Sequence, residues 1–281
     1  MGTEEIKKNI ILLGDPAVGK TSLIRRYVLD QFDERYVTTI GSKVTKKEVL
    51  IQNGGDPIRI IMLIWDIIGQ KEYELTQTLS MKNIDGAILV SDMTRAETIE
   101  SLSTYWLPKI KATRGNIPLV FLANKSDMAD ERVFGVDELE ETAKSGGVDR
   151  NTNLHCFATS AKTGENIESA FHMLAGSLLE KMNTVAGDIP IQDIIRNSEA
   201  KSLAGVVDFI IADFADQYGG MEVATPIVKH QMAMAGLELA NPTLTSVTKF
   251  IDCMANVEKT FKPSPDVSDN RQTRLQKLKD L

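Results

Sequence analysis

The chain has 281 residues, of which 42% are hydrophobic and 25% charged, and its formal net charge is −7. This balance is typical of a soluble globular protein, and the acidic charge argues against general affinity for nucleic acid. The two cysteines are too few for a disulfide framework or a zinc site, which favours a reducing, cytoplasmic compartment. No apolar run approaches the roughly 20 residues that cross a bilayer, and no lipidation motif is recognisable, so we expect no covalent membrane anchor.

Residues 6–183 alternate short apolar runs with longer amphipathic segments. The apolar runs predict strands over Ile6–Leu13, Lys43–Ile51, Ile58–Asp66, Gly86–Asp92, Pro118–Asn124 and Leu154–Thr159. The intervening segments predict helices over Lys20–Leu29, Glu72–Lys82, Thr98–Arg114, Asp137–Ser145 and Asn166–Met182. Because the strands are apolar on both faces, we expect an α/β fold with a six-stranded, mainly parallel, doubly wound sheet. The turn at 53–57 joins two strands directly and makes that pair antiparallel.

A break at 185–190 leads into a second region whose periodicity is purely helical. Apolar residues recur at three- and four-residue steps over 203–214 and 244–261, and Glu222–Ala235 is a further candidate helix. Asn241 and Pro242 are typical of a helix N-cap followed by proline at the first helical position. We therefore expect a first domain over 1–184, a smaller all-α region over 188–262 and a polar flexible tail over 263–281.

The sequence GDPAVGKT, from Gly14 to Thr21, matches the phosphate-binding pattern of glycine, four residues, glycine, lysine and threonine. It lies between a predicted strand and a predicted helix, where backbone amides and the helix N-terminus face a bound phosphate. We expect Lys20 to supply a cation to the β- and γ-phosphates and the Thr21 hydroxyl to bind Mg²⁺. The residues expected around the phosphates are Gly14, Asp15, Ala17, Val18, Gly19, Lys20, Thr21 and Ser22.

Asp66 ends the third predicted strand and begins the sequence DIIGQ. A carboxylate at that strand end is placed for a direct or water-mediated contact with Mg²⁺. Gly69 would let its backbone amide approach a γ-phosphate closely, because glycine has no side chain. Gln70 follows at a position from which it can orient an attacking water.

Two further motifs predict which base is bound. Asn124, Lys125 and Asp127 stand in the sequence NKSD, at the end of the fifth predicted strand. The Asp127 carboxylate can accept hydrogen bonds from the N1 and N2 groups of guanine, whereas adenine offers no such pair of donors. Asn124 can tie neighbouring loops together, and the stem of Lys125 can lie along the base. The sequence SAK, formed by Ser160, Ala161 and Lys162, follows the sixth strand and offers the Ala161 amide to the guanine carbonyl.

Residues 6–183 resemble the Ras superfamily of small GTPases, and the Rab branch most, because GDPAVGKT, WDIIGQ, NKSD and TSAK stand at the family's spacings. Residues 32–41 resemble the first switch of that branch. The resemblance implies that Thr39 reaches Mg²⁺ and the γ-phosphate only in the GTP state, that Phe32 packs against guanine and that Tyr36 closes over the phosphates. The implied cofactors are GTP or GDP and Mg²⁺. The implied catalytic residues are Gln70, Lys20 and Thr39, and the implied metal ligands are Thr21, Thr39 and Asp66.

The chain departs from the family pattern in three places. Ile67 and Ile68 replace two small residues of the second switch, and Pro16 stands in the phosphate loop, where it removes one amide donor. The lipidated tail of the family is replaced by about a hundred residues that resemble nothing we recognise. No arginine of the motifs is placed as a built-in finger, so we expect slow intrinsic hydrolysis and an outside activator.

We therefore expect a guanine-nucleotide switch that hydrolyses GTP slowly and controls partner binding through two loops. Its expected partners are an effector, an exchange factor and a GTPase-activating protein. Two alternatives stay open: a P-loop kinase or ATPase, which Asp127 disfavours, and a scaffold with a permanently bound nucleotide, which Thr39 and Gln70 disfavour. Also open are a protein partner or self-association for the C-terminal helices. A weak membrane contact is a further alternative for the basic tail that contains Arg271, Arg274, Lys277 and Lys279.

Overall fold

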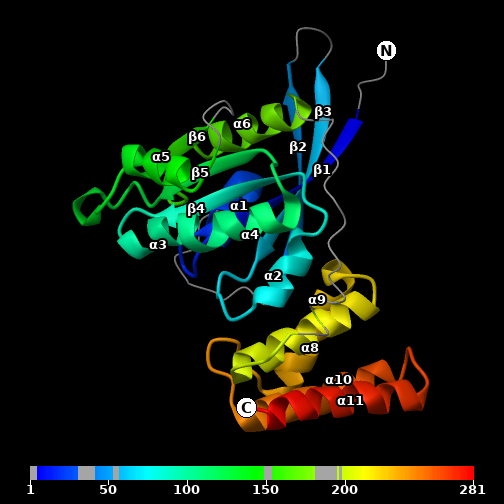
Figure 1. Ribbon diagram of the computed structural model, residues 1–281. Helices are drawn as coiled ribbons and strands as arrows, with labels where there is room; N and C mark the ends of the chain where they lie inside the picture. The colour runs from blue at the N-terminus through cyan, green and yellow to red at the C-terminus, as the bar shows by residue number, and fades with distance from the viewer. Residues whose placement is uncertain (1–4, 31–41, 53–56, 149–153, 181–194, 196–197) are drawn as a thin grey trace. The chain divides into compact units, whose positions relative to one another are not determined.

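The computed structural model describes residues 5–30, 42–52, 57–148, 154–180, 195 and 198–281 (Figure 1). The chain divides into two compact units. Among the described residues, the first unit holds the sheet and its covering helices, while the second joins Gln70–Ser80 to the C-terminal helices. That the short segment Gln70–Ser80 belongs with the C-terminal helices is not predicted by the sequence pattern, which assigns it to the first domain.

A six-stranded sheet with the order β2-β3-β1-β4-β5-β6 forms the centre of the first unit. Its strands are β1 (Glu5–Leu13), β2 (Ser42–Ile51), β3 (Ile58–Ile67), β4 (Gly86–Asp92), β5 (Leu119–Asn124) and β6 (His155–Thr159). The β1–β3, β1–β4, β4–β5 and β5–β6 pairs are parallel. Because only six residues join β2 to its neighbour β3, that pair is antiparallel. The predicted α/β class and mainly parallel six-stranded sheet are confirmed.

Both faces of the sheet are covered, because alternate residues of each central strand enter different cores. On β1, Ile10 and Leu12 belong to one apolar cluster, whereas Ile11 and Leu13 belong to the other. The first cluster contains residues of α1 (Lys20–Leu29) and α6 (Ile167–Glu180). The second contains residues of η1 (Leu102–Trp106), α4 (Leu107–Arg114) and α5 (Val136–Ser145). The alternation thus places helices on both faces and leaves the strand ends to carry the loops.

The remaining elements of this unit differ from the prediction mainly in their ends. The helix expected over 98–114 is a continuous run of α3 (Ala96–Ser101), the wider turn η1 and α4. Pro108 stands in the first turn of α4 and has no backbone N–H to donate, which favours this local widening. A single 3₁₀ turn, η2 (Ala129–Glu131), follows β5. Among the described helices of the whole chain, none combines the length and hydropathy that crossing a bilayer requires.

The second unit contains α8 (Leu203–Gln217), α9 (Met221–Ala235), α10 (Leu244–Glu258) and α11 (Ser264–Lys279), together with most of α2 (Glu74–Met81). Helix α8 begins at the Ser202 N-cap, whose side chain accepts a hydrogen bond from Gly205 N at 3.1 Å. The N-cap of α10 is Thr243, paired with Ser246 in a reciprocal capping box. The predicted cap at Asn241 is therefore wrong, because the threonine hydroxyl reaches the amide three residues on.

The flexible tail expected over 263–281 is instead mostly helix α11. Its Arg274 side chain is fully buried, with Nη2 2.6 Å from Glu258 Oε1 and 2.8 Å from Asp213 Oδ2. Lys277 lies over the Phe209 ring. Composition predicted a solvated end because α11 is highly charged, but these partners neutralise the buried cation and order the segment. Arg274 therefore faces the protein interior and not a membrane surface.

Candidate functional site

The predicted motifs meet at the carboxyl edge of the parallel sheet. The registers place Leu12 of β1 beside Asp66 of β3, and Asp92 of β4 beside Asn124 of β5. Asn124 in turn lies beside Thr159 of β6. Since parallel strands end at the same edge, the loops that follow these residues are neighbours, and such an edge is where open α/β sheets bind ligands.

The phosphate loop is built on backbone that only its small residues allow. Gly14 and Gly19 have φ of 145° and 102°. A Cβ on Gly14 would lie 2.2 Å from the Val90 carbonyl oxygen, and one on Gly19 would lie 2.3 Å from Asn124 Nδ2. Both positions therefore require glycine, and the loop curls into a concavity of backbone amides at the start of α1. Ser22 lies in the first turn of that helix.

Lys20 is 6% exposed and lies inside the curl of the phosphate loop. Its Nζ donates to the carbonyl oxygens of Gly14 and Asp15 at 2.7 and 3.0 Å. Burial lowers the pKa of Lys20 to about 8, although the carboxylates of Asp66 and Asp15 oppose the shift. A phosphate group would supply the negative charge that this buried ammonium lacks, so the site fits an anion.

Asp15 holds the phosphate loop from the interior. Its Oδ1 accepts hydrogen bonds from Ser101 Oγ at 2.7 Å and from Trp106 Nε1 at 2.8 Å. The Asp15 side chain therefore points away from the phosphate position, and only its backbone can serve a ligand. These two donors come from the helix run after β4, which sequence reasoning did not connect to the loop.

The two described metal candidates lie side by side. Thr21 Oγ1 donates to Asp66 Oδ2 at 2.7 Å, and Asp66 is 3% exposed. A hydroxyl and a carboxylate next to a phosphate position are the hard oxygen ligands that Mg²⁺ prefers, so the residues fit this ion. The described residues contain no group of three or more histidine, cysteine, aspartate or glutamate side chains around one point. Thr39, the third implied ligand, lies outside the described residues, and phosphate oxygens and water would complete the coordination.

Gly69 lies against the phosphate loop. A Cβ at this position would be 2.5 Å from Lys20 Nζ and 2.8 Å from the Gly14 carbonyl oxygen, so no side chain fits. The neighbouring Gln70 has a buried Oε1 that accepts no hydrogen bond from the described residues. Ile67 and Ile68, which depart from the family pattern, are both buried, so they fill the core next to this segment. Phe32, Tyr36 and Thr39 lie outside the described residues.

Asn124 connects the phosphate loop to the loop after β6. Its Nδ2 donates to the Val18 carbonyl at 2.8 Å. Its Oδ1 accepts from Thr159 Oγ1 and from the Ala161 amide, both at 3.3 Å. One side chain thus fixes the distance between the candidate phosphate and base subsites, as its place in NKSD suggested.

The candidate base-reading loops are tied to each other as well. Ser160 Oγ donates to Asp127 Oδ1 at 2.5 Å and accepts from the Lys162 amide at 3.2 Å. Arg26 of α1 donates through Nε to the Ala161 carbonyl at 3.0 Å. Asp127 itself is exposed, so its carboxylate lies at the surface where a base can reach it.

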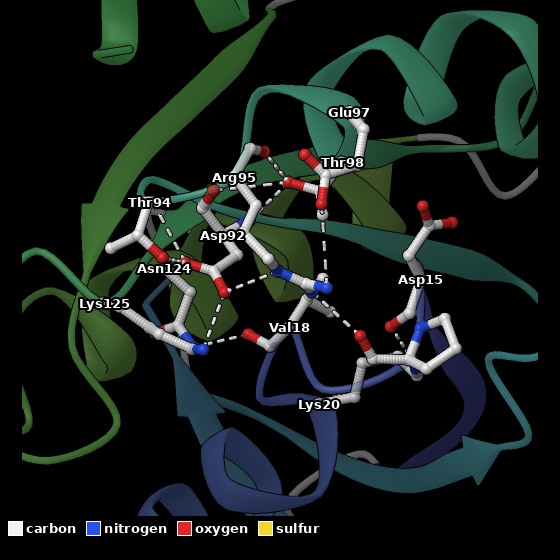
Figure 2. A network of polar contacts seen from close by, with 11 residues as sticks. Asp15, Val18, Lys20, Asp92, Thr94, Arg95, Glu97, Thr98, Asn124 and Lys125 are labelled. Atoms are coloured by element: carbon white, nitrogen blue, oxygen red, sulfur yellow. Dashed lines mark hydrogen bonds and ion pairs between the residues drawn. The ribbon is translucent and has the colours of Figure 1, made fainter. Parts of the chain in front are cut away.

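Sequence reasoning missed two polar residues at the end of β4 (Figure 2). Asp92 is fully buried and lies 2.6 Å from Lys125 Nζ and 3.0 Å from Arg95 Nε. Burial raises the pKa of Asp92, but hydrogen bonds from Lys125 and Thr94 outweigh it and lower the pKa below its ordinary value. The sequence pattern that could have identified Asp92 is an aspartate at the end of an apolar strand, the same pattern as at Asp66.

Arg95 extends this network to the phosphate loop. Its Nη2 donates to the Pro16 carbonyl at 2.8 Å, so the buried Asp92 links the loop of Pro16 with the Lys125 of NKSD (Figure 2). Two independent side chains, Asn124 and Asp92, therefore hold the phosphate loop and the base loops in a fixed relation. Such preorganisation lowers the cost of binding a ligand that spans both.

Comparison with known proteins finds relatives that are similar in sequence. A sequence model described as the Ras family matches residues 9–180. Ras-related protein Rab-7a of Dictyostelium discoideum is 32% identical over 71% of this chain and 97% of the relative. The Ypt/Rab-type GTPase YPT7 of Saccharomyces cerevisiae is 34% identical over 62% of this chain and 84% of the relative. Ras-related protein Rab-1 of Theileria parva is 30% identical over 68% and 83%.

Proposed function

The chain belongs to the Ras family of small GTPases, which bind and hydrolyse GTP, and from this premise we propose that it is a Mg²⁺-dependent switch with slow intrinsic hydrolysis. The proposal assigns the GTPase domain to residues 1–184 and an accessory helical region to the residues from 188 onward, which include α11. Mg²⁺, the two switch loops and the roles of single residues are parts of this proposal.

The observation that carries the proposal is the side-chain bridge between two subsites. Asn124 bonds the phosphate loop at Val18 and the base loop at Ala161. A ligand with a guanine at Asp127 and phosphates at Lys20 therefore meets a preformed frame at both ends. A phosphate-only ligand would make no use of the Asp127–Ser160 pair.

The chemistry follows from the charges of the site. Lys20 and the amides of the phosphate loop stabilise negative charge on the β- and γ-phosphate oxygens as the bond to the γ-phosphorus breaks. Gln70 orients the attacking water in line with the leaving oxygen, for which its Oε1 acceptor is suited. Mg²⁺, when bound by Thr21 and Asp66, neutralises charge on the phosphates. No built-in arginine finger is assigned, so turnover is slow without an activator.

Switching follows from contacts that only the γ-phosphate offers. Thr39 and the Gly69 amide bind that phosphate in the GTP state and release it after hydrolysis, which changes the surface of the two loops. An effector, an exchange factor and an activating protein recognise these states.

Replacing Asp127 with Asn tests base recognition. The amide donates where the carboxylate accepted, so the variant is expected to lose at least tenfold in GDP affinity and to gain affinity for xanthosine diphosphate. Equilibrium titration with both nucleotides measures this preference. Asp130→Asn, which makes the same charge change at an exposed site six residues after Asn124, is the matched control. An unchanged preference in Asp127→Asn would show that the base is read elsewhere.

Replacing Gln70 with Leu tests water positioning. The variant is expected to bind GTP with unchanged affinity but to hydrolyse it about tenfold or more slowly, because the phosphate cradle stays intact while the water acceptor is lost. Single-turnover hydrolysis of preloaded GTP gives the rate, and GDP affinity serves as the control for folding. Equal rates in the two proteins would remove Gln70 from the mechanism.

A further inference from the structure

The segment that follows Gly69 is held by residues of the C-terminal helices. Gln70–Ser80 and these helices form one compact unit. Asp208 of α8 is 3% exposed, and its two carboxylate oxygens accept hydrogen bonds from the backbone amides of Leu75 and Thr76 at 2.7 and 2.9 Å. A buried carboxylate on the first-turn amides of α2 therefore comes from a residue more than 130 positions away.

The α2 helix has no such cap of its own. The residues before Glu74 are Lys71, Glu72 and Tyr73, and none is the serine, threonine, aspartate or asparagine that usually caps an N-terminus. The first amides of a helix need an acceptor, and the positive end of the helix favours an anion there. Asp208 supplies both, so the start of α2 depends on the C-terminal helices.

A second contact supports the first. Tyr73 is 1% exposed, and its hydroxyl donates to the Leu239 carbonyl at 2.8 Å, in the connection between α9 and α10. Burial raises the pKa of Tyr73 well above its ordinary value, with Asp208 adding to the shift. The hydroxyl therefore stays protonated and remains a donor. Three residues of the segment, Tyr73, Leu75 and Thr76, are thus bonded to two different parts of the helical unit.

Gly69, the residue directly before this segment, belongs to the first unit and lies beside the candidate γ-phosphate position. Gly69 packs against Lys20 Nζ so closely that a Cβ would lie 2.5 Å from it. A γ-phosphate bound by Lys20 would lie next to Gly69, and in the proposed switch Gly69 changes position as this phosphate binds. Only five residues lie between Gly69 and Leu75, so the hydrogen bond from Leu75 to Asp208 opposes that shift.

We propose that the C-terminal helices are an intramolecular partner of residues 70–80, and that Asp208 restrains this segment in the conformation that disfavours the GTP state. The inference rests on the proposed function, because it takes Gly69 as the residue that responds to the γ-phosphate. The helical region then does inside the chain what a separate regulator does for other switches. It biases one of two states by binding that state better.

The test uses the full-length protein with Asp208→Asn. The variant keeps the shape of the side chain but removes its charge and one acceptor oxygen, so the capped amides are expected to open more often. Hydrogen exchange of the Leu75 and Thr76 amides, measured in the GDP-bound protein, should be at least about tenfold faster than in the wild type. The ratio of affinities for a non-hydrolysable GTP analogue and for GDP should rise about fivefold or more.

Asp216→Asn is the matched control, because it makes the same charge change on α8 eight residues further along, where no hydrogen bond to the described residues 70–80 is seen. Should Asp208→Asn fail to fold, Tyr73→Phe removes the hydroxyl bonded to Leu239, with Tyr105→Phe as its control. Tyr73→Phe is expected to speed the same amide exchange and to raise the same affinity ratio.

The outcomes separate this inference from the proposed function. Unchanged exchange at Leu75 and Thr76 in both variants overturns the restraint by the helices. Faster exchange with an unchanged affinity ratio overturns its coupling to the nucleotide. A wild-type protein that binds no guanine nucleotide refutes the proposed function, whereas the exchange experiment still decides whether the helices hold the segment. Faster exchange together with a raised ratio supports the whole inference.

Discussion

Two buried cations, one in each compact unit, show how the two parts of the molecule use charge. Lys20 in the first unit is 6% exposed, and burial lowers its pKa to about 8. Arg274 in the second unit is fully buried. Burial lowers the pKa of Arg274 as well, but the carboxylates of Asp213 and Glu258 outweigh it and raise the pKa above its ordinary value.

The difference lies in where the compensating charge comes from. Arg274 has two carboxylates within 2.8 Å, so its charge is balanced by the fold itself. Lys20 bonds two neutral carbonyl groups, and its charge is balanced only in part. A buried charge that the protein leaves incompletely compensated is suited to an ionic ligand, whereas a compensated one holds structure together. In the helical unit the buried charge of Arg274 therefore stabilises the packing, whereas in the sheet unit the buried charge of Lys20 is suited to binding a ligand.

Removing the compensated cation should have the largest effect on stability. Arg274→Met leaves the buried Glu258 and the partly buried Asp213 without their partner, and the free energy of unfolding is expected to fall by about 3–5 kcal/mol. Chemical denaturation followed by circular dichroism measures the loss. Arg271→Met on the same helix breaks an exposed pair with Asp252 and should cost less than about 1 kcal/mol.

The same measurement on Lys20→Met sharpens the comparison. Its charge is stabilised only in part, so the nucleotide-free protein is expected to lose no stability when the ammonium is replaced by an apolar group. A loss as large as that of Arg274→Met would mean that Lys20 is a structural cation. The comparison between the two units would then fail.

The lowered pKa of Lys20 predicts a smaller, pH-dependent effect. Between pH 8 and the ordinary pKa of 10.5, the unfolded chain carries a proton on Lys20 that the folded protein lacks. The unfolded state therefore binds more protons, and the contribution of this group to stability rises as pH increases through that window. A bound phosphate raises the pKa of Lys20 again, so GDP binding near pH 9 should be accompanied by uptake of a proton. The affinity for GDP should therefore fall by up to about tenfold for each unit by which the pH rises above 8.

Calorimetry checks the proton uptake directly. The binding enthalpy of GDP at pH 9 should depend on the ionisation enthalpy of the buffer in the wild type. Lys20→Arg, which stays protonated at this pH, should show no such dependence at nucleotide concentrations high enough to saturate it. A wild-type enthalpy that is the same in all buffers would mean that Lys20 is already protonated in the free protein.

Local patterns in the sequence determined the sheet and the phosphate loop. The strand Gly86–Asp92 and the helix Lys20–Leu29 have the predicted bounds, because apolar runs and glycine placement act over a few residues. The sequence also predicted that Lys20, Asp66 and Asn124 lie at one edge of the sheet, since parallel strands that alternate with helices end on the same side.

Contacts between residues distant in sequence were decided only by the tertiary structure. The burial of Arg274 in a segment expected to be a loose tail depends on Glu258 and Asp213, which lie 16 and 61 residues away. The hydrogen bonds from the start of α2 to Asp208, and the link from Asp92 through Arg95 to Pro16, likewise join residues that are distant in sequence. A local pattern reports which side chains are polar, but a buried charge is stable only with a partner, and the partner is chosen by the packing of the whole chain.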